Sequence, residues 1–454
     1  MNIKYNSKKI QKGDTFIALK TNNDGHKYIN DAIKNGATKI VAEYGSYPVE
    51  TLLVDNTKEY LVKYLYENYY QEIKDLKLIG ITGTNGKTTT CMLLHNMLNM
   101  LGRKTAYIGT NGFYINKFIK ELPNTTPEIL DIYELLIEAK KEGCEFVCIE
   151  ASSHGLAQNR LENLKFDYAI FTNLTHEHLG YHKTMKNYAL AKQKLFTMLR
   201  NNKYAIINND DNYKNYFILK ENNNITYSLN NGNYYVKEYK ITTQNNIFTV
   251  VNNNKEYTFT TKLLGKHNIY NNLASIIVLN KIGYSFEEIN NVLTIVSGPK
   301  GRMENISYNN NNIIIDYAHT PDGIANVLNT AKELHPNKII TIVGCGGGTG
   351  SDRTKRSEMG NLVLSLSDKT IFTNDNPRDE DPNQIINDLL KEKINNNYII
   401  ELDRKKAINK GINMLTNNDI LLILGKGHEN YQIIGNKKTH FNDKETVLEI
   451  TKEK

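Results

Sequence analysis

The chain has few cysteines and no long hydrophobic run, and both shortages exclude classes of protein. Only four cysteines occur in 454 residues. They show neither the paired spacing of a zinc site nor a dense disulfide pattern, so we expect small core residues in a reducing compartment. The best apolar run, Ile420 to Leu424, is far shorter than the roughly 18 residues that span a bilayer. The start, MNIKYNSKKIQKGD, has no apolar signal-peptide core, which predicts a cytoplasmic protein without membrane insertion.

Arginine is also scarce. Only eight occur, whereas lysine is abundant, and the net charge of +7 is spread along the chain. This balance suits phosphate-bearing small molecules as well as nucleic acid. Because no helix-turn-helix, RNA-binding or zinc pattern appears, we expect no nucleic-acid partner. In a lysine-rich chain an arginine suggests two-pronged binding of carboxylate or phosphate. Five of the eight lie in the motifs described below: Arg160, Arg302, Arg353, Arg356 and Arg378.

The order of apolar and polar segments predicts about three α/β domains. Residues 1–75 indicate a small first domain and residues 76–302 a central one. Residues 303–454 indicate a third, doubly wound domain. Strands alternating with helices predict mostly parallel sheets. The stretch 213–262, rich in Tyr, Thr, Ile and Val with Asn-rich turns, breaks this rhythm and predicts β-hairpins inserted beside the main sheet.

The strongest local motif is GITGTNGKTT at residues 80–89, between an apolar strand and an amphipathic helix. In this context glycines let backbone N–H groups close around phosphate oxygens, so we expect a P-loop. Lys87 would bridge the β and γ phosphates, and Thr88 would bind Mg²⁺. The common spacing would place glycine where Ile81 stands, which makes this a shortened variant. The alternative is a glycine-rich turn with a lysine in solvent. The residues predicted to bind nucleotide here are Gly83, Thr84, Asn85, Gly86, Lys87, Thr88 and Thr89.

Two further residues are candidate metal ligands. Glu150 ends the strand FVCIE, at the edge where open α/β sheets place ligands, and a carboxylate there can hold Mg²⁺. Taken alone, it would more often be a helix cap or a surface residue. His178, in THEHLGYH, is the second candidate, although a lone histidine is usually structural.

The segment NYALAKQKLF at 187–196, together with GTNGKTT, resembles the Mur ligase superfamily of ATP-dependent amide-bond-forming enzymes. The resemblance covers nearly the whole chain and depends on the order and spacing of its motifs. It implies a three-domain α/β architecture with a central P-loop-type parallel sheet and a C-terminal Rossmann-like domain. The other motifs are YNSKKIQKGDTFIAL, TNNDGHKYI, NTTPE, EASSHGLAQNR, NLTHEHLGYH, GKHNIYNN, GRME, DYAHTPDGI, KRSEMG, DNPR and GKGHENYQIIGNK.

The resemblance also implies a reaction in peptidoglycan precursor synthesis. ATP phosphorylates the D-glutamyl carboxylate of UDP-N-acetylmuramoyl-L-alanyl-D-glutamate, and the amine of meso-diaminopimelate attacks the acyl phosphate. In the family, CO₂ carbamylates the residue that matches Lys192. This carbamate would organise two Mg²⁺ ions together with Thr88, Glu150 and His178. We expect a monomeric enzyme. The catalytic residues implied are Lys87, Lys192, His178 and Arg302.

Three groups of substrate-binding residues follow from the resemblance. For ATP they are His267, Asn268, Asn271, Arg302 and Asp316, with His319 as a further candidate. For the UDP-sugar peptide they are Tyr5, Ser7, Asn124, Thr125, Thr126, Ser152, Gln158 and Arg160. For diaminopimelate they are Arg353, Asp375, Asn376, Pro377, Arg378, Gly425 and Glu429. Taken one at a time, the sugar-site residues could equally be loop caps, and Arg302 could be an interdomain ion pair.

The choice of amino acid depends mainly on DNPR, which marks the diaminopimelate-adding members of the family. Arg378 could bind the distal carboxylate through two parallel hydrogen bonds, and with lysine a buried guanidinium would lose that partner. One departure weakens this expectation. Aligned on Lys355 and Arg356, the arginine that family members use on diaminopimelate becomes Ser351, and Arg353 would have to replace it.

Two alternatives remain open. One is a sister ligase that uses L-lysine or a folate substrate, although SSHGLAQNR and DNPR argue against the folate enzyme. The other is a regulatory ATPase, which would leave DNPR and GKGHE without a role. The distribution of motifs also predicts that the third domain swings in to bring Arg302, Asp316 and Arg378 against the P-loop domain.

Overall fold

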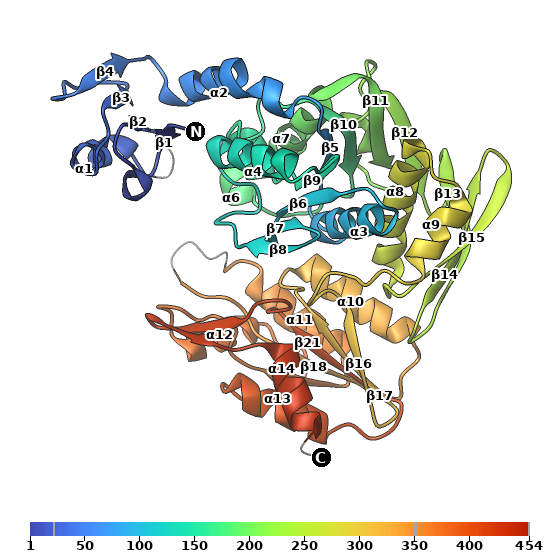
Figure 1. The fold of residues 1–454 in the computed structure, drawn as a ribbon. Coiled ribbons are helices and arrows are strands. Elements are labelled where there is room, and N and C mark those ends of the chain that lie inside the picture. The colour runs from blue at the N-terminus through green and yellow to red at the C-terminus, as the bar shows by residue number, and fades with distance from the viewer. Residues whose placement is uncertain (21–22, 349–352, 453–454) are drawn as a thin grey trace.

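Three parallel or mostly parallel sheets follow one another along the chain (Figure 1). The computed structural model describes residues 1–20, 23–348 and 353–452. The first sheet has four parallel strands in the order β1-β2-β3-β4. Its strands are Ile3–Lys4, Thr15–Ile17, Lys39–Ala42 and Glu50–Leu53, accompanied by α1 (Ile29–Lys34) and α2 (Thr57–Ile73).

The central sheet has eleven strands in the order β15-β14-β13-β12-β11-β10-β5-β9-β6-β7-β8. The strands from β13 to β6 pair in parallel, and two antiparallel strands follow at each end. The strands are β5 (Lys77–Thr82), β6 (Thr105–Gly109), β7 (Gly112–Ile115), β8 (Lys117–Lys120), β9 (Phe146–Glu150), β10 (Phe166–Phe171), β11 (Leu199–Asn208), β12 (Asn223–Ser228), β13 (Tyr234–Ile241), β14 (Asn246–Asn252) and β15 (Lys255–Thr261).

Helices cover both faces of this sheet, which explains why its middle strands are apolar throughout. Apolar side chains of α3, α8 and α9 pack on one face, and those of α2, α4 and α7 pack on the other. The helices are α3 (Lys87–Met100), α4 (Ile129–Lys141), α5 (Ser153–Ala157), α6 (Leu179–His182), α7 (Met185–Thr197), α8 (Lys266–Ile282) and α9 (Phe286–Leu293).

The C-terminal sheet has six strands in the order β16-β17-β21-β18-β19-β20, of which only β16 runs antiparallel. Helices α10 to α12 pack on one face, and α13 and α14 pack on the other. The strands are β16 (Glu304–Tyr308), β17 (Asn311–Asp316), β18 (Ile339–Val343), β19 (Lys369–Phe372), β20 (Tyr398–Ile400) and β21 (Ile420–Leu424), with a separate hairpin of β22 (Tyr431–Ile434) and β23 (Lys437–His440). The helices are α10 (Pro321–Glu333), α11 (Arg356–Leu366), α12 (Pro382–Leu389), α13 (Arg404–Asn413) and α14 (Asp443–Lys452).

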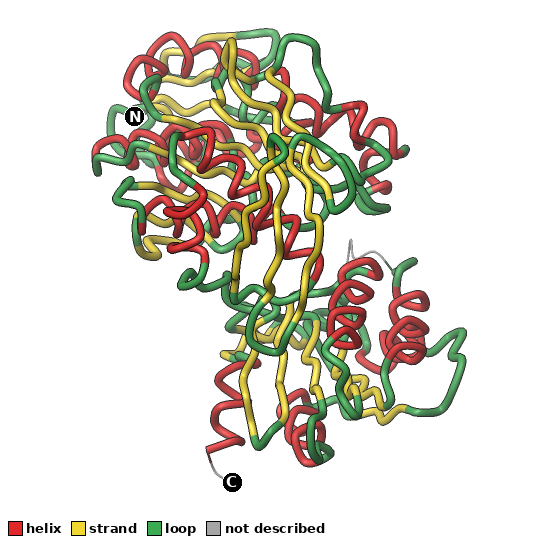
Figure 2. Tube along the Cα trace, turned by 90° about the vertical axis from the view of Figure 1, so that its right-hand side faces the viewer, coloured by secondary structure: helices red, strands yellow, loops and turns green. Residues whose placement is uncertain are grey.

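The expected α/β architecture is confirmed, with one correction in the stretch 213–262. The predicted hairpins are present, since β13 pairs antiparallel with β14 and β14 with β15. They do not lie beside the main sheet, because β12 pairs with β11 and β13 with β12, so that these strands extend the sheet itself. Figure 2 shows the long strands running from the central unit toward the C-terminal one. At their end, the Asn305 side chain donates to the carbonyl of Thr243 at 3.2 Å.

The predicted domain limits, 1–75, 76–302 and 303–454, stay a proposal, and each range contains one main sheet. All four cysteines are buried free thiols, as expected. No helix in the part of the chain that the structure describes is long and apolar enough to cross a membrane.

Candidate active site

The P-loop joins β5 to α3, and two glycines make its path possible. Gly83 has φ +151°, and a Cβ there would lie 1.8 Å from the Thr172 hydroxyl oxygen. Gly86 has φ +86° directly before α3, and a Cβ there would lie 2.5 Å from Oδ1 of Asn271. A side chain at either position would meet both backbone strain and a clash. The loop can therefore approach its neighbours closely, as a phosphate-binding turn requires.

Two lysine ammonium groups converge on this loop. Lys87 Nζ donates to the carbonyls of Gly83 and Thr84 at 2.9 and 2.8 Å. Lys192 Nζ, on α7, donates to the same Gly83 carbonyl at 2.7 Å. Lys192 is buried, and burial lowers its pKa well below the ordinary value, with the charge of Lys87 adding to the effect. Burial also lowers the pKa of Lys87, against the attraction of Glu177 and Glu150.

Glu150 is a fully buried carboxylate at the end of β9, beside the P-loop. Its Oε2 accepts from the Thr88 hydroxyl at 2.8 Å, and its Oε1 accepts from the Tyr107 hydroxyl. The backbone N–H and the hydroxyl of Thr110 donate to the same carboxylate at 3.0 and 3.2 Å. Oxygen ligands of this kind suit Mg²⁺. The structure therefore brings Thr88 and Glu150 together as predicted.

His178 does not share that contact. Its Nε2 lies 3.6 Å from Glu177 Oε2, and its ring packs edge-on against His154 and Tyr188. The Lys192 ammonium lies 4.5 Å from the centre of the Tyr188 ring, so His178 and Lys192 flank one tyrosine. Burial lowers the pKa of His178, which keeps its imidazole available as a neutral ligand. Among the described residues, no group of three or more His, Cys, Asp or Glu side chains forms a ready metal site.

A cavity of about 690 Å³ lies between the central sheet and the C-terminal unit. It is lined by eight of the residues predicted to bind ATP: Asn85, Gly86, Thr89, His267, Asn268, Asn271, Arg302 and Asp316. The predicted loop residues Gly83, Thr84, Lys87 and Thr88 are not part of its lining. His319 also lines the cavity.

The C-terminal wall of this cavity is held by Asp316. Its two carboxylate oxygens accept from the backbone N–H groups of Met303 and Ala318, each at 2.7 Å. The Arg302 guanidinium lies 4.7 Å from the centre of the Tyr317 ring, and its buried Nε has no partner among the described residues. Among the described residues, Arg302 therefore does not form the interdomain ion pair that was considered as an alternative. Burial lowers the pKa of His319 to about 4, and its Nδ1 donates to the Tyr317 carbonyl at 2.9 Å.

Residues that the sequence reasoning missed complete the cavity. Asn173 and Thr172 follow β10, and their side chains hold the Asn85 backbone: the N–H donates to Asn173 Oδ1 at 2.9 Å and the carbonyl accepts from Thr172 Oγ1 at 2.6 Å. From the C-terminal unit, Asp322 Oδ2 accepts from Asn85 Nδ2 at 2.5 Å. The position of Thr172 and Asn173 after a buried parallel strand was the signal that could have identified them.

The residues predicted for the UDP-sugar peptide form two groups. Tyr5 and Ser7 line a cavity of about 650 Å³ in the first unit, and the Tyr5 hydroxyl donates to Asp131 of α4. Around the start of α4 lie Thr126, Ser152, Gln158 and Arg160, which interlock through Thr126 and Arg160. Thr125 contacts the Thr110 hydroxyl at 3.0 Å, and Asn124 is exposed.

Arg160 is engaged inside the protein. Its Nε pairs with Glu128 Oε1 at 3.0 Å, and its other nitrogens donate to Thr126 O and Gln158 Oε1 at 2.8 and 2.6 Å. Its side chain is about one-tenth exposed. A guanidinium with this many partners orders the loop before α4 and can reach a ligand only at its edge.

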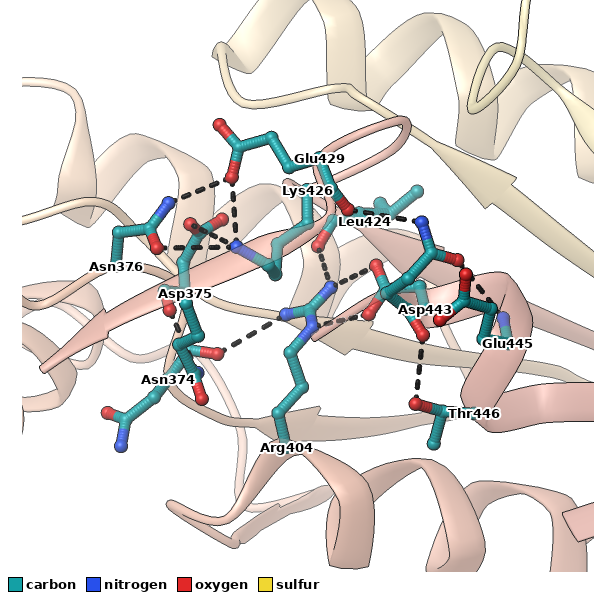
Figure 3. Close-up of polar contacts among 12 residues, drawn as sticks. Asn374, Asp375, Asn376, Arg404, Leu424, Lys426, Glu429, Asp443, Glu445 and Thr446 are labelled. Atoms are coloured by element: carbon teal, nitrogen blue, oxygen red, sulfur yellow. Dashed lines mark hydrogen bonds and ion pairs between the residues drawn. The ribbon is translucent and has the colours of Figure 1, made fainter. Parts of the chain in front are cut away.

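Asp375, Asn376 and Glu429, three of the residues predicted for diaminopimelate, lie together beyond the carboxyl ends of β19 and β21 (Figure 3). Asp375 and Asn376 are buried, and Asn376 Nδ2 donates to Glu429 Oε2 at 2.8 Å. Gly425 has φ +110°, and a Cβ there would lie 2.6 Å from Asp375 Oδ2. Beneath them, a fully buried Arg404 forms two bonds with Asp443, at 2.7 and 2.8 Å.

The two predicted arginines differ from expectation. Arg378 is exposed, so the expected buried guanidinium is wrong; its Nη1 donates to the Gly347 carbonyl at 2.7 Å. Arg353 is also exposed and lies 3.3 Å from Glu380, whose carboxylate is already held by the buried Arg356. Ser351 lies outside the described residues. Pro377 is buried between Asn376 and Arg378.

Family models match most of the chain. The Mur ligase middle domain matches residues 81–279, and the Mur ligase glutamate ligase domain matches residues 301–427. The chain therefore belongs to the Mur ligase family, the class of enzyme that its fold and P-loop indicate.

Proteins similar to this chain share a name that is more specific than the family name. Proteins named UDP-N-acetylmuramoyl-L-alanyl-D-glutamate–2,6-diaminopimelate ligase from Fusobacterium nucleatum and Clostridium perfringens are 41% and 39% identical to it. The alignments cover 98% and 99% of this chain and 92% and 94% of theirs. A solved structure of a ligase with this name is 31% identical, with TM-score 0.70, covering 99% of this chain and 94% of that one. MurF ligase from Thermotoga maritima shares the fold at 19% identity and TM-score 0.70, covering 99% and 97%.

Proposed function

We propose that this chain uses ATP to join 2,6-diaminopimelate to the D-glutamate of UDP-N-acetylmuramoyl-L-alanyl-D-glutamate, releasing ADP and phosphate. The observation that carries the proposal is the near full-length alignment with relatives that bear the name of this activity. The reaction needs ATP because a free carboxylate is a poor acylating agent, and phosphorylation supplies a leaving group. We also propose a cytoplasmic monomer, as the sequence predicts.

The cavity between the central and C-terminal units is the proposed ATP site. The P-loop N–H groups and the start of α3 would bind the phosphates, and Lys87 would turn from the loop carbonyls to the β and γ phosphates. Arg302 supports this proposal because its buried Nε has no hydrogen-bond partner among the described residues and the residue lines the cavity. Asp316 would orient the ribose or the Arg302 segment. His267 and His319, each with a pKa lowered to about 4 by burial, would be neutral at working pH.

Thr88 and Glu150 fit a magnesium ion, since both are oxygen ligands in direct contact. Mg²⁺ bound there would neutralise charge on the transferred phosphoryl group. His178 and Lys192 are proposed for a second position, with Lys192 as a carbamate. The environment of Lys192 supports this modification, because only an unprotonated amine reacts with CO₂ and burial lowers the Lys192 pKa. A carbamate oxygen and the Gly83 carbonyl oxygen would repel each other, so the carbamate would have to move away from that carbonyl.

The UDP-sugar peptide is proposed to extend from the first unit toward Glu150. Tyr5 and Ser7 would contact the uridine end in their cavity, and Asn124, Thr125 and Ser152 would hydrogen-bond to the sugar and peptide. Thr126, Gln158 and Arg160 support this path by ordering the segment around it. The peptide carboxylate would then reach the γ-phosphate beside Lys87.

Diaminopimelate is proposed to lie with its distal centre over Asn376 and Glu429. Glu429 and the Gly425 carbonyl would accept hydrogen bonds from the distal ammonium, and Arg378 would bind the distal carboxylate. Arg353 would assist from the same side as Arg378. Because the Arg378 guanidinium is exposed, its contribution to discrimination is smaller than for a buried arginine, about 1 kcal/mol.

The test is ADP release with ATP, Mg²⁺ and the UDP-sugar dipeptide, comparing meso-diaminopimelate with L-lysine. We expect release that depends on diaminopimelate, and about fivefold weaker use of it by Arg378→Ala, as about 1 kcal/mol implies. Preference for lysine would keep the ligase but remove the assigned role of Arg378. ATP turnover independent of any amino acid would favour the regulatory ATPase instead.

A further inference from the structure

A fully buried lysine, Lys426, lies beneath the proposed amino-acid site. It follows β21 in the turn between Gly425 and Gly427, and its side chain is 0% exposed. A buried ammonium is costly unless every donor is matched, so its surroundings indicate what it is for. None of the roles proposed above involves it.

The Lys426 ammonium faces three oxygen acceptors (Figure 3). Its Nζ donates to Glu429 Oε2 at 2.9 Å and to Asn376 Oδ1 at 3.3 Å. Asp375 Oδ1 lies 3.9 Å away as a third, longer partner. These three acceptors belong to residues of the proposed diaminopimelate site.

The amide of Asn376 closes a triangle with this lysine and Glu429. Its Oδ1 accepts from Lys426 and also from the backbone N–H of Ile433 at 2.9 Å. Its Nδ2 therefore must donate, and it does so to Glu429 Oε2 at 2.8 Å. Glu429 Oε2 thus receives two hydrogen bonds, whereas no described residue bonds to Oε1. Figure 3 shows this second oxygen pointing away from the network.

The charges around Lys426 suit an ammonium ligand. Asp375 and Glu429 carry two negative charges close together, and burial raises the pKa of Asp375, with the Glu429 charge adding to the effect. The Lys426 charge opposes this rise and stabilises the ionised form of Asp375. One negative charge then remains for an incoming cation.

We propose that Lys426 is a positioning residue for amino-acid recognition: together with Asn376 it fixes Glu429 so that Oε1 accepts the distal ammonium of the substrate. This inference rests on the proposed function. Lys426 acts through Glu429 and does not touch the substrate itself.

The test is Lys426→Met, which keeps the length of the side chain and removes the charge. We expect KM for diaminopimelate to rise at least about tenfold, with KM for ATP unchanged within about twofold. Lys405→Met is the matched control, because Lys405 belongs to the same unit in an exposed ion pair with Glu449. An unchanged KM for diaminopimelate in a folded K426M would overturn the proposal.

Two further measurements distinguish a positioning role of Lys426 from a general structural role. In a cycle with Glu429→Gln, the double variant should be no worse than E429Q alone, since both changes remove one interaction. The Lys426 charge lowers the pKa of Asp375, so without the lysine this carboxyl binds a proton more readily. KM of K426M should therefore improve from about pH 6 to about pH 8.5 more than KM of the wild type does. Additive effects, or parallel pH profiles, would contradict a role through Glu429.

If K426M does not fold, Lys426→Arg keeps the buried charge but displaces the donors. We then expect KM for diaminopimelate to rise at least about threefold with ATP unaffected, and no change would overturn the inference. If the wild type releases no ADP with any amino acid, the proposed function fails first and this inference fails with it. If the wild type prefers lysine, the same KM comparison is made with lysine, whose distal ammonium is the shared group.

Discussion

The two lysines that share the Gly83 carbonyl have different surroundings. Lys87 opens α3 and needs its charge for phosphates, whereas Lys192 is buried on α7 over the Tyr188 ring. Since the folded-state pKa of Lys192 lies below its unfolded value, the neutral amine gains population in the native state. As pH falls through that lowered pKa, the amine becomes protonated and can no longer react with CO₂.

Lys192→Met should therefore lose activity by at least ~100-fold, since an anion beside the transferred phosphoryl group is removed. Wild-type protein equilibrated with ¹³C-bicarbonate should give a carbamate carbon signal in NMR that K192M lacks, and the signal should weaken as pH is lowered. Lys186→Met, an exposed change on the same helix, serves as control. Full activity of K192M would exclude the carbamate.

At the scale of single residues, the sequence predicted the lining of the nucleotide cavity better than it predicted the residues that hold this lining in place. Asn85, Gly86 and Thr89 of the motif at 80–89 line one cavity, and the five residues predicted between His267 and Asp316 line it with them. Asn173 and Asp322 were not predicted, because neither belongs to a phosphate-binding pattern. Both are distant from Asn85 in the sequence, and only the folded chain brings them into contact with it. The exposure of Arg378 could not be read from DNPR, because burial depends on the loop that packs over it.

Among the elements, the turn from β5 into α3 offers a clean test of backbone strain against close packing. Gly86 and Gly102 flank α3 with φ +86° and +80°, but only Gly86 has a neighbour within 4 Å of a would-be Cβ. Each Gly→Ala change should cost about 1 kcal/mol from the left-handed backbone. Gly86→Ala alone should also raise KM for ATP, because Asn271 must move. Thermal unfolding and ATP kinetics of both variants distinguish the two costs, and equal ATP kinetics would refute the assignment of Gly86.

Elements with an apolar pattern were predictable, and edge elements were not. The amphipathic helix predicted after the motif at 80–89 is α3, and the strand FVCIE is β9. The hairpins β7–β8 and β22–β23 were missed: β8 (KFIK) and β23 (KKTH) are exposed along their whole length. Such strands bury neither face, so they lack the alternation of apolar and polar residues that sequence patterns detect.

For the whole molecule, the nucleotide cavity joins two units that meet at Asn85 and Asp322. Binding of an ATP analogue together with the UDP-sugar dipeptide should make the enzyme more compact in X-ray scattering, as the C-terminal unit closes on the P-loop. Asp322→Ala should reduce that compaction and lower kcat/KM for ATP about tenfold, the size expected for a lost charged hydrogen bond. Asp322→Asn, which can still accept from Asn85, should lose less. Equal scattering with and without ligands would contradict closure.

The eleven-stranded sheet described above has two open ends, β8 and β15. An unpaired strand edge invites strands from another molecule, and lysine is a common protection, since its ammonium must lose water before a new strand can dock. Lys117 and Lys255 stand exposed at the starts of these two strands. These charges allow the edge strands of a wide sheet to face solvent without pairing with a strand of another molecule. They therefore favour separate molecules over edge-to-edge aggregates.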